Sequence, residues 1–202
     1  MWDFCGIIGQ RGERIAIGME RMLGARFFPD AQLNFAENVL RQRGSGDALV
    51  FNGENRRHST LSHDELRAEA GRFAAGLRAA GVRAGDRVGA YIPNMPEAMI
   101  ASLGAATIGA VWSSCSPDFG VQGVLDRFGQ IAPRVIVASD GYFYAGKVHD
   151  IRPKLAAVLG KLPSVEHTIV VPRCAHEIKK NREGGEHGEH DKEPATKRAA
   201  FL

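Results

Sequence analysis

The sequence of 202 residues is poor in lysine, cysteine and long apolar runs, and each shortage argues against a class of protein. No lysine precedes Lys147 and the net charge of +3 is dispersed, so the composition gives no argument for a nucleic-acid partner. Cys5, Cys115 and Cys174 are too few and too far apart for a disulfide framework or a zinc site, so we expect reduced thiols. No signal peptide and no uninterrupted membrane-spanning run is visible. These features predict a cytoplasmic protein with no membrane partner.

What is present is a strand–helix–strand unit over residues 86–120. An apolar run at 88–92 ends at Pro93 and is typical of a buried strand. Residues 95–110 are apolar nearly all round and predict a buried helix, with Asn94 as its expected N-cap. Residues 110–112 then predict the next strand. A polar run follows at the edge where parallel sheets bind their ligands, outside the carboxyl end of a strand.

The same alternation continues along the chain and predicts an α/β doubly wound parallel sheet. The best-defined helix begins with a capping box at Ser62 and Glu65 and ends at Gly81. The other expected elements are a helix near 35–40 capped by Asn34, a hairpin of 47–52 with 56–61, helices at 121–131 and 148–160, and strands at 134–139 and 168–172. We expect three parts: a covering segment at 1–40, the sheet domain at 41–172, and a disordered charged tail at 173–202.

Five motifs, taken in order, resemble the adenylate-forming acyl-CoA synthetases. They are Asn34-Phe35-Ala36-Glu37-Asn38-Val39-Leu40, Gly85-Asp86-Arg87-Val88, Pro93-Asn94-Met95-Pro96-Glu97-Ala98, Gly109-Ala110-Val111-Trp112 and Ser113-Ser114-Cys115-Ser116-Pro117-Asp118-Phe119-Gly120. Within this family, the run from Trp112 to Gly120 is similar to the subgroup that activates acetoacetate rather than the subgroup that activates acetate. The resemblance covers about residues 2–172 and implies the flavodoxin-like part of the family's N-terminal domain.

The resemblance implies a two-step ligation that uses ATP, Mg²⁺ and coenzyme A with a small carboxylic acid. The acid would attack the α-phosphate of ATP, and the thiol of coenzyme A would then displace AMP. The family's phosphate loop, its adenylate and ribose motifs and its catalytic lysine are missing from this sequence. We therefore expect a truncated, inactive fragment with no catalytic residue of its own, unable to bind those cofactors fully.

The candidate residues for binding the acyl group or coenzyme A lie in one stretch: Trp112, Ser113, Ser114, Cys115, Ser116 and Asp118. The resemblance places this stretch near the acyl and pantetheine end of the site. The competing interpretations are a turn in which Asp118 caps the following helix and a packing role for Trp112. A nucleophilic role for Cys115 is disfavoured because no base lies near it in the sequence. No metal site is expected, and the pair His187 and His190 in the charged tail is interpreted as solvated.

Three functions remain open at this point. The first is an acetoacetate–CoA ligase fragment, and the second is a ligase fragment for another short acyl group such as acetyl or propionyl. The third is a non-catalytic α/β binding module. A sheet cut after its first strands would also leave an unpaired apolar edge, through which the chain could self-associate.

Overall fold

The computed structural model describes residues 1–21, 23–54, 58–175 and 199–200, and a parallel sheet forms its centre. The sheet order is β11-β10-β7-β5-β6, in which β5 at Arg87–Tyr91 lies between β7 and β6, and β6 at Val111–Cys115 forms one edge. The remaining strands are β7 (Val135–Ser139), β10 (His167–Val171) and β11 (Ala199–Ala200). Every pairing is parallel, and the four longer strands follow the flavodoxin-like order 2-1-3-4. The predicted fold class is confirmed.

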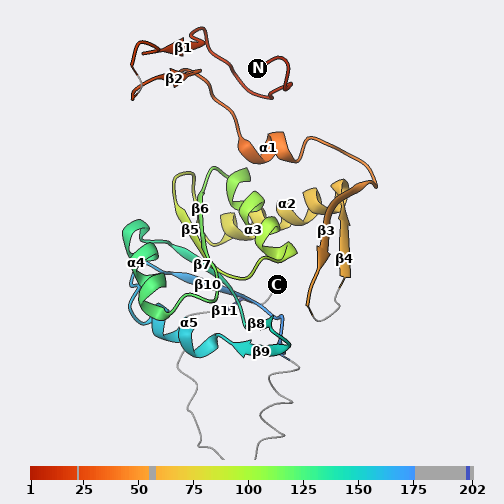
Figure 1. Cartoon of the computed structure of the whole chain (residues 1–202), viewed down its shortest axis with the longest axis vertical. Coiled ribbons are helices and arrows are strands. Elements are labelled where there is room, and N and C mark those ends of the chain that lie inside the picture. Colours follow the sequence, from red (N-terminus) through yellow and green to blue (C-terminus); the bar gives the residue numbers. More distant parts are fainter. Residues whose placement is uncertain (22, 55–57, 176–198, 201–202) are drawn as a thin grey trace, which may run out of the picture.

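Helices cover both faces of this sheet (Figure 1). On one face lie α2 (His63–Ala79) and α3 (Pro96–Thr107), which pack with alternate strand residues such as Val88, Ala90 and Val137. On the other face lie α4 (Val121–Ile131) and α5 (Arg152–Leu159), which pack with Tyr91, Ile136 and Ala138. The near-continuous apolar strands are therefore explained by burial on both sides.

The predicted capping box is present at the start of α2. The Ser62 hydroxyl accepts a hydrogen bond from the N–H of Glu65 at 3.3 Å, and the Glu65 carboxylate accepts one from the N–H of Ser62 at 2.8 Å. At the other end Gly81 has a φ of +79°, the left-handed conformation expected after a helix. The boundaries of this helix were thus readable from the sequence.

Two local predictions are wrong. Residue Met95, not Asn94, is the N-cap of α3, and no side chain bonds to the exposed N–H groups there. Residues 141–150 form an antiparallel hairpin of β8 (Gly141–Tyr144) and β9 (Lys147–Asp150), so the helix predicted at 148–160 begins only at Arg152. Its turn places Ala145 and Gly146 at φ values of +51° and +72°. That is the geometry of a tight hairpin turn, which alanine rarely adopts.

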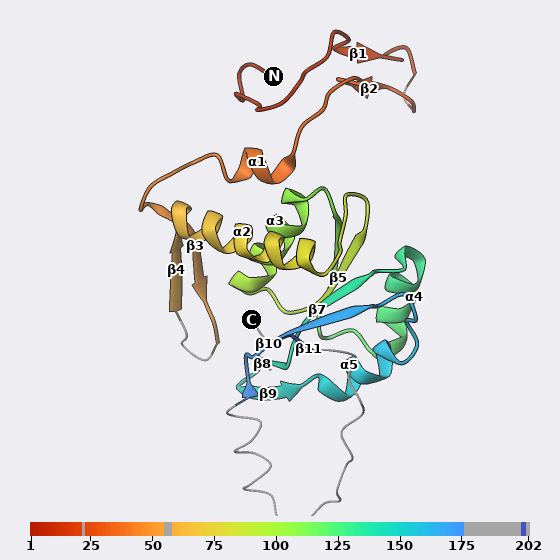
Figure 2. The same ribbon diagram turned by 180° about the vertical axis from the view of Figure 1, so that it is seen from behind.

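The N-terminal residues form a small hairpin and a short helix. The hairpin consists of β1 (Ala16–Ile17) and β2 (Arg26–Phe27), and Figures 1 and 2 show it beyond α1 at one end of the molecule. Helix α1 (Phe35–Val39) lies against α3, and Asn34 caps it as predicted, accepting from the N–H of Glu37 at 3.1 Å. Contact with the sheet domain is thus made by α1. A second hairpin, β3 (Asp47–Asn52) with β4 (His58–Ser62), leads into α2.

Beyond Pro172, the expected end of the sheet domain, the structure describes residues 173–175 and 199–200. Cys174 is buried, and the two-residue β11 pairs with β10. Most of the expected tail, residues 176–198 and 201–202, lies outside the described residues, and with it the pair His187 and His190. Among the described residues, no helix is both long enough and apolar enough to cross a membrane.

Candidate functional site

The predicted binding stretch lies at the edge of the sheet, in β6 and in the loop that joins it to α4. The strand extends to Cys115, so Ser113 and Ser114 are strand residues and not loop residues as expected. Trp112 packs with the core on the α2–α3 face, whereas Cys115 packs with the core on the α4–α5 face. Because side chains alternate along a strand, Ser114 shares the face of Trp112 and Ser113 shares the face of Cys115. Trp112 and Ser114 therefore lie on the α2–α3 face of the sheet, and Ser113 and Cys115 lie on the α4–α5 face.

The loop after β6 holds the other two predicted residues together. The Ser116 hydroxyl donates to Oδ2 of Asp118 at 2.9 Å, and the N–H of Phe119 donates to the carbonyl of Ser116 at 3.2 Å. Both polar side chains are exposed, while Pro117 between them is fully buried. Gly120 is the N-cap of α4 and makes no side-chain bond, so the alternative interpretation of Asp118 as the helix cap is wrong.

A buried tyrosine that was not among the predicted site residues contacts the backbone of this loop from the interior of the domain. Tyr91 ends β5, and its side chain is fully buried. Its hydroxyl lies 2.7 Å from the carbonyl oxygen of Phe119 and 3.0 Å from that of Pro117. Burial raises the pKa of Tyr91 to about 12, so the phenol stays protonated and donates. The available signal was a polar-tipped aromatic residue in an otherwise apolar strand.

The unexpected hairpin β8–β9 adds a second contact to the loop. The Tyr142 hydroxyl interacts with the Asp118 carboxylate, which together with the larger effect of burial raises the pKa of Tyr142. The Tyr142 ring stacks on His149 with centroids 4.8 Å apart. On the opposite side, the Arg127 guanidinium lies 4.0 Å above the Phe119 ring. The loop is thus fixed by contacts from β5, from β8 and from α4.

The thiol of Cys115 is poorly suited to nucleophilic chemistry. Its residue is 4% exposed, and burial raises the pKa of the thiol, with Arg127 acting weakly in the opposite direction. A buried neutral thiol is a small apolar packing group. Cys115 therefore acts as a packing residue of the core on the α4–α5 face.

Another buried polar residue at the carboxyl edge of the sheet is Asp140, which follows β7. Its Oδ1 accepts from the N–H groups of Arg173 at 2.7 Å and Cys174 at 2.8 Å. Its backbone carbonyl accepts from the N–H of Ile151 at 3.2 Å. Asp140 therefore ties the end of β7 to the start of α5 and to the chain leaving β10.

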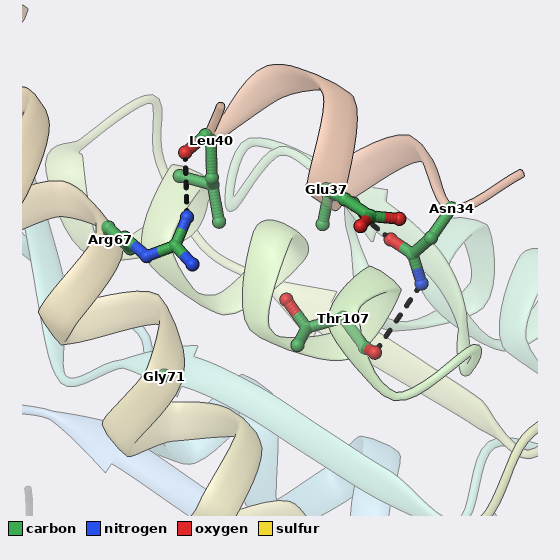
Figure 3. Close-up of a pocket in the computed structure, with 7 residues that line it drawn as sticks. Asn34, Glu37, Leu40, Arg67, Gly71 and Thr107 are labelled. Carbon is green, nitrogen blue, oxygen red and sulfur yellow. Dashed lines mark hydrogen bonds between the residues drawn. The ribbon is translucent and has the colours of Figure 1, made fainter. Parts of the chain in front are cut away.

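A separate hollow of about 370 Å³ lies between α1, α2 and α3, at the amino edge of the sheet (Figure 3). Arg67 donates to the carbonyl of Leu40 at 2.9 Å across it, and Asn34 donates to the carbonyl of Ala106 at 2.9 Å. Its lining residues are Asn34, Ala36, Glu37, Leu40, Arg67, Gly71 and Thr107. None of the predicted binding residues lines it. Over the described ranges, no cluster of three or more His, Cys, Asp or Glu side chains could hold a metal ion.

The parallel sheet with a polar loop at its carboxyl edge is the architecture of a nucleotide- or ligand-binding α/β domain. The profile of the family described as AMP-binding enzyme matches residues 35–201, and the chain belongs to this family. This match extends beyond Pro172, where the sequence analysis ended the resemblance.

Within this family, the chain is similar to several acetoacetyl-CoA synthetases. The chain is 54% identical over 172 residues to an acetoacetyl-coenzyme A synthetase from Rhizobium meliloti, and 39% identical over 175 residues to an acetoacetyl-CoA synthetase from Macaca fascicularis. Each alignment covers 85% of this chain and 26% of the relative. The solved structure of acetoacetyl-CoA synthetase from Streptomyces lividans matches with a TM-score of 0.80 and 40% identity, over 85% of this chain and 27% of that one. The chain therefore spans about a quarter of the length of the relatives it matches.

Proposed function

We propose that this chain forms part of an acetoacetate–CoA ligase, in which it contributes the acyl- and coenzyme A-facing loop after β6. The complete reaction would convert acetoacetate, ATP and coenzyme A into acetoacetyl-CoA, AMP and pyrophosphate. The observation that carries the proposal is the 54% identity to an acetoacetyl-coenzyme A synthetase over 172 residues, a stretch long enough to include β6 and its loop. Acetyl and propionyl groups are the alternative acyl substrates.

The loop suits the uncharged part of coenzyme A. Pantetheine carries amide groups and no charge, and such groups pair with hydroxyl and carboxylate side chains. Ser116 and Asp118 offer both of these at the surface, next to Phe119, which is 37% exposed. Within the strand, Ser113 is partly accessible and Ser114 is exposed, whereas Cys115 is a packing residue. We assign contact with the ligand to Ser116 and Asp118 first.

The chain's residues do not fit the triphosphate of ATP and its Mg²⁺. The sequence contains no glycine- and serine-rich loop that ends in Pro-Lys, which is the device that would surround the phosphates. Within the part of the chain that the structure describes, no acidic cluster could hold the metal. We therefore assign no step of the phosphate chemistry to residues of this chain.

A chimaera tests the proposal directly. The 172 residues of this chain that align with the Rhizobium meliloti relative replace the matching segment of that relative. AMP release is then measured with coenzyme A and acetoacetate, acetate, propionate or butyrate. We expect the chimaera to prefer acetoacetate, as the unaltered relative would in parallel. A preference for acetate or propionate would refute the acyl assignment. An inactive but folded chimaera would refute the claim that this segment serves the reaction.

The outer edge of β6 supports a proposal about self-association. Within the described residues β6 pairs on one side only, with β5. The N–H of Val111 donates to Asp86 on the β5 side, so the alternation of a parallel ladder turns the backbone groups of Trp112 and Ser114 outward. The strand has no charge, and Val111 is 50% exposed. Such an edge can pair with a second copy of the chain.

A further inference from the structure

Tyr91 occupies a place where phenylalanine would fill the same space. Its ring belongs to the core cluster that includes Val124 and Phe128 of α4, and this packing needs no oxygen. The hydroxyl is nevertheless placed against two backbone carbonyls of one short loop, those of Pro117 and Phe119. A buried hydroxyl is tolerated because it finds such partners. The Tyr91 ring therefore packs in the core, while its hydroxyl hydrogen-bonds to the loop.

The direction of these two carbonyls decides which groups the loop exposes. No peptide bond in the described chain is cis, and in a trans peptide the C=O and N–H groups point in opposite directions. Because the carbonyls of Pro117 and Phe119 point inward to Tyr91, the N–H groups of Asp118 and Gly120 point outward. The N–H of Asp118 accordingly meets the exposed Ser116 hydroxyl at 3.4 Å.

The same arrangement fixes the polar side chains. Asp118 lies between the two anchored carbonyls, and its carboxylate is held by Ser116 at 2.9 Å and by Tyr142. If the anchored carbonyls were released, both peptide planes could rotate, and Asp118 would turn with them. The Tyr91 hydroxyl is thus the group that contacts the backbone carbonyls of this turn, whereas Tyr142 and Arg127 contact its side chains.

We propose that the Tyr91 hydroxyl is a positioning group that holds the Pro117–Phe119 backbone in its ligand-binding conformation. This inference rests on the function proposed above, in which Ser116 and Asp118 contact coenzyme A. Tyr91 itself touches no ligand and acts only through the loop.

The test compares Tyr91→Phe with the unaltered chain in two measurements. Amide hydrogen exchange reports the opening of the loop at residues 118–121, and isothermal titration with coenzyme A reports binding. Asn34→Ala is the matched control, because it also removes a side chain that bonds to backbone groups but does so at the opposite edge of the sheet. Thermal unfolding of each variant is measured first, and exchange is compared at equal distance from the unfolding midpoint.

We expect Tyr91→Phe to speed exchange in residues 118–121 and to weaken coenzyme A binding about tenfold, roughly the effect of one lost hydrogen bond. Asn34→Ala should change neither quantity. Unchanged loop exchange in Tyr91→Phe would overturn the positioning role. Faster exchange with unchanged affinity would overturn the link to ligand binding.

The two proposals fail in different ways. If the unaltered chain binds no coenzyme A, the binding assignment of the loop and the ligand half of this inference both fail. The exchange measurement still decides whether Tyr91 fixes the loop.

Discussion

Gly104 in α3 lies in close contact with α2, and substitution there should separate the two helices. A methyl group built on Gly104 would lie 2.9 Å from the carbonyl oxygen of Ala70 and 2.8 Å from Cδ1 of Phe73. Both distances are shorter than a carbon atom tolerates. The Phe73 ring is buried and Ala70 contributes a backbone atom, so neither can rotate out of the way.

Two opposing effects set the size of the loss in Gly104→Ala. Overpacking a well-filled core costs about 1–3 kcal/mol, and the upper part of this range applies because a backbone atom must move. Replacing glycine by alanine inside a helix returns about 1 kcal/mol. The net effect is a destabilisation of about 2 kcal/mol. In a chain of this size, that corresponds to a fall of about 4–8 °C in Tm.

Thermal unfolding followed by circular dichroism measures this effect, with Gly76→Ala as the control. Gly76 lies on the exposed side of α2, and nothing lies within 4 Å of a methyl group there. The same substitution should therefore stabilise the chain, by about 0.4–1 kcal/mol. Equal Tm values for the two variants would refute the close approach of α2 and α3.

Four further outcomes are expected. Ser62→Ala removes the capping box and should cost about 1 kcal/mol in urea unfolding. The pKa of Asp86 is lowered by the N–H of Arg83 and then by Arg134, so its stabilising effect is complete above the ordinary pKa of 3.8 and is lost as the pH falls through the lowered value. Asp86→Asn should therefore flatten the acid limb of a stability–pH curve. Val111→Lys should reduce self-association measured by light scattering, because a charge on an open strand edge blocks pairing. The purified chain should release no pyrophosphate from ATP with acetoacetate and Mg²⁺. Acetoacetate-dependent release would refute the statement that the residues of this chain do not fit the triphosphate of ATP and its Mg²⁺.

The central strands and helices could be predicted because local and tertiary preferences agree there. The run at 88–92 is apolar at every position that the two core clusters use, and the capping box at Ser62 needs only residues close in sequence. The boundary at Gly81 follows from backbone chemistry in the same way. Such features depend little on distant contacts.

The hairpin at 141–150 could not be predicted because its turn lacks the usual residues. Tight hairpin turns favour Asn-Gly or Asp-Gly, whereas this one has Ala145 at a positive φ. Its strands are held by tertiary contacts, such as the stack of Tyr142 on His149 and the approach of Tyr142 to Asp118. For Asn94, the sequence offered a good cap, but the backbone enters α3 one residue later.

The internal arrangement of the candidate loop could not be predicted from the sequence. The sequence shows three serines and an aspartate between residues 113 and 118, yet the extension of β6 to Cys115 depends on pairing with β5. Tyr91 lies more than twenty residues before the loop that it supports, so no local pattern links them. Contacts of this kind become visible only in the folded chain.

The two edges of the sheet are stabilised in different ways, which indicates where function can be separated from stability. At the amino edge, Arg134 binds the carbonyl of Gly81 at 2.8 Å, Asp86 at 3.2 Å and Glu166 at 2.9 Å, and so joins three connections that lead into strands or helices. At the carboxyl edge, Tyr91 places its one proton against the exposed loop of the candidate site. Loss of Arg134 would loosen the connections that set the strand positions, whereas loss of the Tyr91 hydroxyl changes one turn. Binding should therefore be more sensitive than folding to changes at the carboxyl edge, and the reverse should hold at the amino edge.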